Sequence, residues 1–271
     1  MLPTHSPPAC KSMCGLHRER KDNSQREIGS KADRSLRVSK IIELMQLQGL
    51  EKHKPHQLSG GQQQRAALSR IIIGDPRLLM LDEPFSSLDS HLRGQLQIQL
   101  KEVIIQFGKE VLLVTHSRDE AYRLCGRIAL IDDGKVVAHK DTKELFGDPE
   151  SRRAALITGC KNIVDARKVG EHEVEVPQWG ISLKTAKQVR NDLCAIGIRA
   201  HYFDPALTDN CFPIRIIGEM EEPFESIWQF RYDNQDESAA DILWQTPKNR
   251  SGERSATKLG VAPEDVLPLY E

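Results

Sequence analysis

Apolar positions with the period of an α-helix recur in three stretches of the chain, over residues 38–45, 63–73 and 92–107. The first stretch ends near Gly49, and glycines follow the other two directly, as is typical of helix C-termini. The pattern therefore predicts three helices. Residues 1–35 are instead polar and rich in Lys, Arg, Asp and Ser, which predicts irregular structure or a frayed helix.

Short apolar runs of strand length lie between and after these helices. Residues 77–81 and 110–115 each predict a buried strand. Residues 127–131 predict a third strand, which turns at residues 132–134 into a hairpin with residues 135–138. Because strands and helices alternate, this part of the chain predicts an α/β layer with a parallel sheet.

The pattern changes after about Cys160, where short strand-like runs are separated by Gly, Pro, Asn and Asp. This spacing predicts a small β-barrel or β-sandwich. We therefore expect two domains, one over residues 1–155 and the other over residues 156–271. The strands predicted in the second domain are residues 172–176, 181–183, 198–202, 214–217, 227–232 and 241–244.

Composition narrows the classes of function. With 38 basic and 39 acidic residues the chain is almost neutral, so nothing favours a nucleic-acid partner. No apolar run approaches the ~20 residues of a membrane-spanning helix, and the first residues lack the apolar core of a signal peptide. The six cysteines are scattered rather than grouped at zinc-site or disulfide-framework spacing. We therefore expect a cytoplasmic protein, and the close pair Cys10 and Cys14 is interpreted as incidental.

A glycine-rich helix start is the first candidate binding site. Ser59 is a natural N-cap, and Gln62, three residues later, completes an S-x-x-Q capping box. Gly60 and Gly61 leave the backbone bare around the first turn, where free N–H groups and the helix dipole suit a phosphate. Taken alone, the segment is better explained as a well-capped helix.

Two adjacent carboxylates follow the strand predicted at residues 77–81. In a phosphoryl-transfer site Asp82 would hold Mg²⁺, usually through water, and Glu83 would orient or deprotonate the attacking water. The alternative is an acidic surface turn, which the preceding apolar run disfavours.

A histidine ends the next predicted strand. His116 is expected at the same edge of the sheet as the two carboxylates, where its imidazole would contact a γ-phosphate or the attacking water. A lone histidine more often has a structural role, so this assignment depends on the neighbouring carboxylates. Ser117 and Glu120 form a second capping box, so we expect a helix directly after His116.

Together these segments resemble the ATP-binding subunits of ABC transporters. Their order and spacing over residues 36–147 are those of the family, which is a far more specific signal than any one motif. The resemblance implies that residues 58–62 are the signature motif, residues 78–82 the Walker B strand, Glu83 the catalytic glutamate, residues 86–89 with Asp89 the D-loop, and His116 the switch histidine. It also implies that ATP and Mg²⁺ are the cofactors.

The phosphate-binding Walker A sequence G-x-x-x-x-G-K-[ST] does not occur in these 271 residues. The resemblance implies that it and the Q-loop lie upstream, and residues 2–16 faintly resemble the stretch that follows the Q-loop. We therefore expect a partial P-loop NTPase fold that lacks its N-terminal part. We also expect that the chain alone neither binds ATP tightly nor hydrolyses it, so its status as an enzyme is left open.

The second domain resembles the TOBE domain, an OB-like β-barrel that follows the ATPase in importers of oxyanions and sugars. Residues 197–201 and 259–266 are similar to strands of that domain, the latter to its closing strand. Residues 14–18 and 160–162 are most similar to molybdate-type importers, with sulfate and other solutes still open. The resemblance implies an oxyanion as a possible ligand of this domain.

Three hypotheses about function remain at this stage. The first is an ATP-hydrolysing importer subunit on the cytoplasmic face of the membrane, paired with a second ATP-binding subunit and a transmembrane permease, as the resemblance implies. The second is a regulatory protein without ATPase activity that caps the nucleotide of a partner. The third is a non-functional fragment. Intact Asp82, Glu83 and His116 mildly favour the first.

Overall fold

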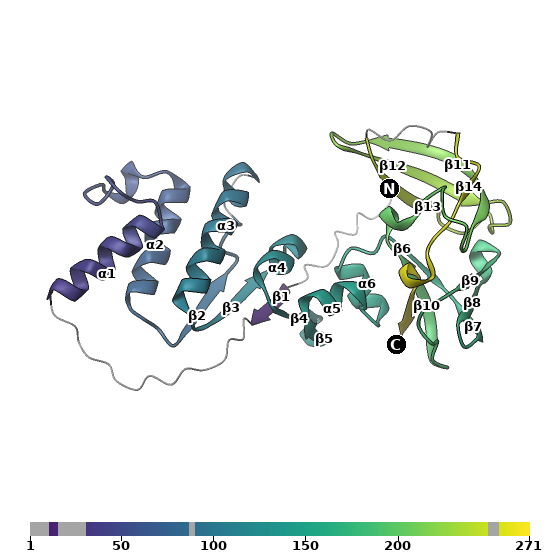
Figure 1. Cartoon of the computed structure of the whole chain (residues 1–271), viewed down its shortest axis with the longest axis horizontal. Helices are drawn as coiled ribbons and strands as arrows, with labels where there is room; N and C mark the ends of the chain where they lie inside the picture. Colours follow the sequence, from purple (N-terminus) through teal and green to yellow (C-terminus); the bar gives the residue numbers. More distant parts are fainter. Residues whose placement is uncertain (1–10, 16–30, 87–89, 249–254) are drawn as a thin grey trace, which may run out of the picture. The chain divides into compact units, whose positions relative to one another are not determined.

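The computed structural model describes residues 11–15, 31–86, 90–248 and 255–271. The chain divides into two units, Met1–Lys143 and Glu144–Glu271 (Figure 1). The division lies earlier than the predicted boundary at residues 155/156. We describe each unit by itself.

A five-stranded sheet organises the first unit, in the order β2-β3-β1-β4-β5. Strand β2 is parallel to β3, whereas β1 runs antiparallel to both of its neighbours, β3 and β4. It follows that β3 and β4 point in the same direction, with one reversed strand between them. The five strands are β1 (Lys11–Gly15), β2 (Leu78–Asp82), β3 (Glu110–Thr115), β4 (Arg127–Asp132) and β5 (Lys135–Asp141).

Strand β1 corrects two expectations from the sequence. Residues 1–35 were expected to be irregular, but Lys11–Gly15 form the central strand, and the sheet is mixed rather than parallel. The physical reason is that β1 pairs through its backbone with β3 on one side and β4 on the other. Such pairing satisfies the N–H and C=O groups of both neighbours without an apolar sequence pattern.

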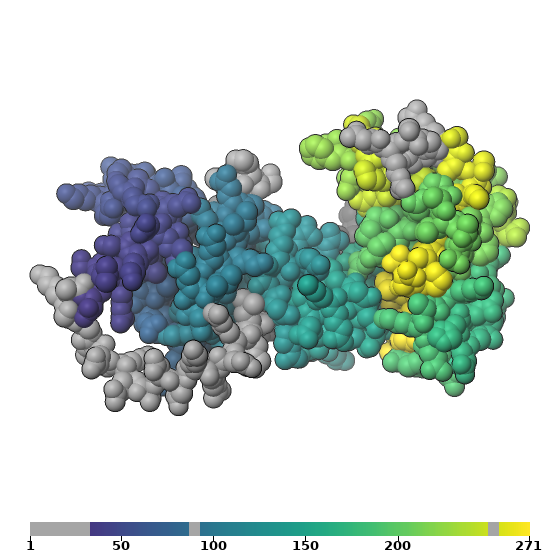
Figure 2. All heavy atoms as spheres, in the orientation of Figure 1, coloured from purple at the N-terminus to yellow at the C-terminus, as the bar shows by residue number. Residues whose placement is uncertain are grey.

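Four helices complete the first unit: α1 (Lys31–Leu44), α2 (Gly60–Ile73), α3 (Ser90–Phe107) and α4 (Arg118–Leu124). Helix α1 packs against α2, and their atoms form one continuous surface (Figure 2). Helices α3 and α4 lie on the same face of the sheet (Figure 1). The three helices expected from apolar periodicity are confirmed, although α1 begins within the segment expected to be irregular.

The predicted hairpin between β4 and β5 is confirmed, and its turn has a clear local cause. Asp133 and Gly134 have φ values of 48° and 72°, so both central residues are left-handed. Two left-handed residues form the turn type whose twist matches that of the flanking strands. Gly134 adopts this conformation without the steric cost that a side chain would add.

The second unit is rich in β-structure. Its strands form three sheets, in the orders β15-β10-β6, β13-β12-β11-β14 and β7-β8-β9. The short helices α5 (Thr142–Gly147) and α6 (Arg152–Ile157) precede them. The strands are β6 (Asn162–Asp165), β7 (Arg167–Gly170), β8 (Glu173–Val176), β9 (Ile181–Lys184), β10 (Leu193–Ile198), β11 (Phe212–Glu221), β12 (Glu225–Tyr232), β13 (Ile242–Pro247), β14 (Lys258–Leu259) and β15 (Leu267–Tyr270).

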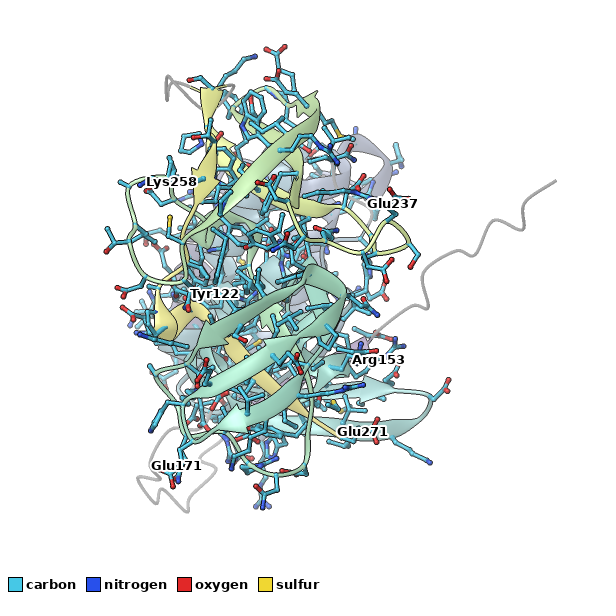
Figure 3. All side chains as sticks on the ribbon, turned by 90° about the vertical axis from the view of Figure 1, so that its right-hand side faces the viewer. Tyr122, Arg153, Glu171, Glu237, Lys258 and Glu271 are labelled. Carbon is cyan, nitrogen blue, oxygen red and sulfur yellow. The ribbon has the colours of Figure 1, made fainter. Side chains whose placement is uncertain are left out.

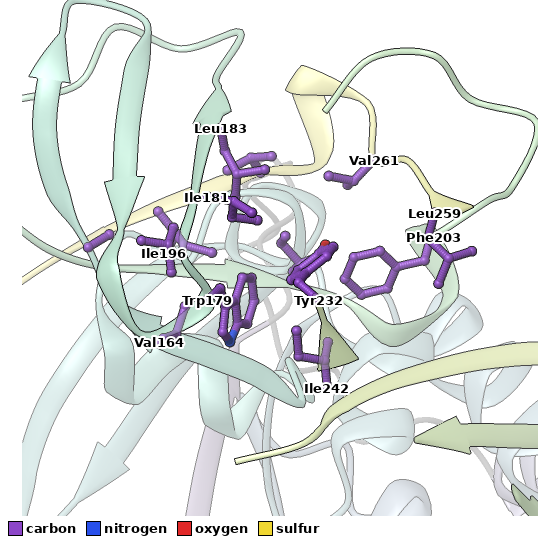
Figure 4. Close-up of a cluster of buried hydrophobic side chains, with 14 of the residues drawn as sticks. Val164, Trp179, Ile181, Leu183, Ile196, Phe203, Tyr232, Ile242, Leu259 and Val261 are labelled. Carbon is purple, nitrogen blue, oxygen red and sulfur yellow. The ribbon is translucent and has the colours of Figure 1, made fainter. Parts of the chain in front are cut away.

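Aromatic and branched side chains from all three sheets meet in one core. Figure 4 shows Trp179, Phe203 and Tyr232 among aliphatic side chains that are all buried. The indole of Trp244, fully buried, donates a hydrogen bond to the carbonyl oxygen of Phe203 at 2.9 Å. The polar end of this large side chain is therefore satisfied inside the core.

Two strand predictions in the second unit are wrong. Residues 198–202 were expected as a strand, but β10 ends at Ile198 and Ala200–Tyr202 form a 3₁₀ turn. The expected closing strand at residues 259–266 is divided into β14 and a 3₁₀ turn at Pro263–Asp265. The final strand is β15, a run of buried residues at the end of the chain.

Charged side chains point outward from the turns. Glu171 and Glu237 project from two turns of the second unit into solvent (Figure 3). Among the helices of the described residues, none is both long and apolar enough to cross a bilayer.

Arg199 explains why α6 and the larger part of α5 belong to the second unit. Its side chain is buried, with only 8% of the residue exposed. One guanidinium nitrogen donates to the carbonyl oxygen of Thr158 at 2.8 Å, and another donates to that of Phe146 and to the hydroxyl of Thr158. Phe146 lies in the last turn of α5 and Thr158 directly follows α6, so Arg199 joins both helices to the end of β10.

Replacing Arg199 by Met should destabilise the second unit by about 2–4 kcal/mol, because one buried and one half-buried carbonyl lose their charged donor. Urea unfolding followed by tryptophan fluorescence measures this unit alone, since all three tryptophans lie in it. Arg167→Met, at an exposed position of β7, is the matched control, with an expected change within about 0.5 kcal/mol. Equal midpoints for the two variants would contradict the assignment.

Candidate functional site

The capping box predicted at the start of α2 is confirmed in both directions. The backbone N–H of Gln62 donates to Ser59 Oγ at 3.3 Å, and that of Ser59 donates to Gln62 Oε1 at 2.9 Å. Ser59 itself has the extended backbone of an N-cap. The start of this helix is therefore fixed by two reciprocal hydrogen bonds.

The two glycines of this turn have different surroundings. A Cβ built on Gly60 would meet nothing within 4 Å, and the residue is exposed. Gly61 is buried, and its Cβ would lie 3.7 Å from the side chain of Leu96 in α3. As first residues of a helix, both have N–H groups without a preceding intrahelical acceptor. Gly60 thus keeps the approach to the helix start open, while Gly61 allows α2 and α3 to pack closely.

Sequence reasoning did not identify Gln63. Its side-chain amide donates to the carbonyl oxygens of Pro55 at 2.9 Å and Leu58 at 3.1 Å. These bonds hold the segment before the glycines against the first turn of α2. The only signal in the sequence is a run of three glutamines, which does not distinguish one from the next.

The end of β2 presents the two carboxylates in different settings. Asp82 is exposed at the last position of the strand, and Glu83 is half-buried directly after it. The N–H of Glu83 donates to the carbonyl oxygen of Val114 in β3 at 2.8 Å. Glu83 has a φ of 44°, a left-handed conformation that costs a non-glycine residue about 1–2 kcal/mol. The strand therefore ends in a sharp turn at the glutamate.

His116 and Glu83 meet at this edge of the sheet. Nδ1 of His116 lies 3.3 Å from Oε1 of Glu83, with 59% of the histidine side chain and 32% of the glutamate side chain exposed. The structure thus brings together the two residues predicted to be catalytic. Both remain accessible to a ligand that approaches from solvent.

The turn behind His116 differs from its prediction. Ser117 Oγ accepts a hydrogen bond from the N–H of Glu120 at 3.3 Å, as a capping box requires. The carboxylate of Glu120 does not return to Ser117, however, but accepts a hydrogen bond from Thr115 Oγ1 at 2.5 Å. Since Thr115 and Glu120 are both buried, this pair is satisfied in the interior.

The residues present suit a magnesium ion that arrives with phosphate. Among the described residues, no group of three or more His, Cys, Asp or Glu side chains could hold a metal ion. Mg²⁺ typically uses one or two carboxylates and completes its shell with water and substrate phosphates. Asp82, exposed at the end of β2, fits as that single carboxylate. Asp89, the remaining candidate, lies outside the described residues.

Two further features lie apart from these residues. A cavity of about 1070 Å³ opens between α3, α4 and the start of α5, and none of the candidate residues lines it. Cys125, which borders this cavity, takes part in a disulfide, whereas Cys160, Cys194 and Cys211 are free.

Comparison with known proteins supports the family inferred from these residues. Residues 11–86 match the family model described as ABC transporter. The Fe(3+) ions import ATP-binding protein FbpC of Haemophilus influenzae is 34% identical over 163 residues, which cover 60% of this chain and 46% of that protein. The putrescine transport ATP-binding protein PotG of Escherichia coli is 38% identical over 135 residues, covering 50% of this chain and 36% of that protein.

Solved structures add two similar chains. One is a bacterial ABC transporter cassette solved as a dimer, with 34% identity, a TM-score of 0.37 and coverage of 44% of this chain and 51% of that chain. The other is CbiO1 of Clostridium perfringens, from the transporter complex cbiONQ, with 26% identity, a TM-score of 0.41 and coverage of 48% and 52%.

The chain spans less than half the length of the two curated relatives described above. Within that span, its α/β part is similar to the ATP-binding subunits of ABC importers, and a β-rich region follows it.

Replacing Ser59 by Ala should lower the stability of α2 by about 1 kcal/mol, because the N–H of Gln62 loses its acceptor. Hydrogen exchange at the Gln62 amide reports this loss directly. Ser59→Thr retains a hydroxyl and should preserve most of the protection. An unchanged exchange rate in Ser59→Ala would show that the capping bond contributes nothing.

Proposed function

We propose that this chain acts as the ATP-binding subunit of an ABC importer and supplies the signature helix, the Walker B carboxylate, the catalytic glutamate and the switch histidine. The observation that carries the proposal is the 3.3 Å contact between His116 and Glu83, directly beside Asp82. The 271 residues contain no Walker A loop, so the loop that surrounds the phosphates must come from outside them.

The chemistry assigned to this edge is water attack on the γ-phosphate of ATP. Glu83 is placed to orient the water and accept its proton, and His116 to hold the glutamate and contact the phosphate. Asp82 would hold Mg²⁺ through water; when bound, the ion neutralises charge on the phosphate oxygens. The exposure of His116 and Glu83 suits a ligand that completes the site by covering them.

The signature helix serves a different nucleotide. Gly60, exposed with open space around it, leaves the positive end of α2 accessible to a phosphate held by another subunit. We infer a second ATP-binding subunit as partner, with Ser59, Gly61 and Gln62 shaping the helix start. A transmembrane permease would hold the pair at the cytoplasmic face of the membrane.

The transported solute is proposed to be molybdate or a related oxyanion. The support is the resemblance of residues 160–162 and of the β-rich unit to the TOBE domains of such importers. Cys160 is buried, and its pKa is raised to about 11 by burial, so the thiol packs in the interior rather than binding an anion. An oxyanion site would therefore use other residues of this unit.

A second function follows from the missing Walker A loop. A chain with the signature helix but without that loop can cap a partner's nucleotide while hydrolysing none itself. This regulatory role differs from the first proposal in one measurable property, the dependence of ATP hydrolysis on Glu83.

The purified chain is expected to release phosphate from Mg·ATP no faster than its Glu83→Gln variant, because no loop holds the β- and γ-phosphates. A malachite-green assay of both proteins measures this. Hydrolysis clearly above that of Glu83→Gln would contradict the expectation and show that the chain holds ATP unaided.

Mixed with an ATP-binding subunit that has a Walker A loop, the chain should associate in the presence of ATP. Gly60→Glu should abolish the association, since it places a carboxylate where the phosphate approaches. Gly94→Glu is the matched control, because its Cβ also has open space but lies on α3. Analytical ultracentrifugation measures the complex, and equal loss in both variants would refute capping through Gly60.

A further inference from the structure

A single buried hydroxyl lies behind the exposed histidine. Thr115, only 1% exposed, accepts a hydrogen bond from the N–H of Ser117 at 3.0 Å. The same hydroxyl donates to the carboxylate of Glu120 at 2.5 Å, and Glu120 is 4% exposed. Since Thr115 precedes His116 and Ser117 follows it, the two bonds of one hydroxyl span the backbone of the histidine.

Three hydrogen bonds connect this group. The Thr115 hydroxyl donates to Oε2 of Glu120. The same Thr115 oxygen accepts from the N–H of Ser117, whose own hydroxyl accepts from the N–H of Glu120 at 3.3 Å. The turn is thus bound to the last residue of β3 and to the first turn of α4.

The histidine side chain has little support of its own. Its imidazole is 59% exposed, and the polar contact that the structure gives it is Glu83 Oε1 at 3.3 Å. Because the ring is accessible, its position depends on the direction in which the backbone presents it. That direction is set by the buried group behind it.

We propose that Thr115 and Glu120 are positioning residues that hold His116 toward Glu83 and thereby select its tautomer. The catalytic use of an oriented His116 rests on the proposed function, whereas the hydrogen bonds that orient it do not. In the contact with the carboxylate, Nδ1 donates, and the Nδ1–H tautomer leaves Nε2 as an acceptor. Neither residue touches the reacting atoms; both act through the histidine.

The tautomer of His116 can be measured in the full chain without ATP. Long-range ¹H–¹⁵N NMR of histidine-labelled protein distinguishes Nδ1–H from Nε2–H rings. Wild type and Thr115→Ser, which keeps the hydroxyl, should show mainly the Nδ1–H form. Thr115→Val and Glu120→Ala should raise the ratio of Nε2–H to Nδ1–H by about 5-fold, as expected for the loss of one net hydrogen bond. Glu83→Ala should raise it at least as much.

Thr142→Val is the matched control. Thr142 is also buried in the first unit, and its hydroxyl donates to the carbonyl oxygen of Cys125 at 2.5 Å, away from the His116 turn. This variant should lose a similar bond and leave the tautomer ratio unchanged. A shift equal to that of Thr115→Val would reduce the effect to general destabilisation and overturn the proposal.

Two other results would also overturn it. One is an unchanged ratio in folded Glu120→Ala, which removes the buried carboxylate even if Thr115→Val does not fold. The other is an unchanged ratio in Glu83→Ala, which would mean that the carboxylate does not select the tautomer. Failure of ATP hydrolysis or of subunit capping would refute the proposed function but would leave these measurements interpretable.

Discussion

The parallel register between β2 and β3 is the constraint on which the candidate catalytic site depends. Asp82 pairs with Val114, and the N–H of Glu83 continues the ladder to the Val114 carbonyl. Because parallel strands end at the same edge, this register brings His116 within reach of Glu83. A slip of one residue would turn every side chain of β2 to the other face, and alternating burial along both strands resists that slip.

The site combines accessible chemical groups with a buried framework. His116 and Glu83 are open to solvent, so neither gains much stability from packing, and Glu83 has in addition an unfavourable left-handed backbone. The surrounding ladder must compensate for this conformation. Thr115 and Glu120 support the turn at His116 from the interior, where their mutual hydrogen bond is shielded from water. Rigidity thus comes from residues that no ligand touches.

What the sequence reveals depends on whether an element is defined by its own pattern or by its partners. The strand at Glu110–Thr115 was predicted with its observed bounds, because a six-residue apolar run follows a helix-ending glycine. Strand β1 was missed, since its place depends on backbone pairing with β3 and β4. Glu120 was assigned to the wrong partner for the same reason: capping spacing identifies its N–H bond, whereas its carboxylate bonds to a residue of β3.

The negative charges at the end of β2 oppose the binding of a polyphosphate. Asp82 and Glu83 place two carboxylates where a polyphosphate would have to approach, and like charges 4 Å apart repel by about 1–4 kcal/mol each in water or near a surface. A magnesium ion and the backbone amides and lysine of a P-loop normally offset this repulsion. The 271 residues contribute the carboxylates and the histidine but no such loop. In the proposed site, Asp82 and Glu83 therefore disfavour a polyphosphate until a separate segment supplies the compensating charge.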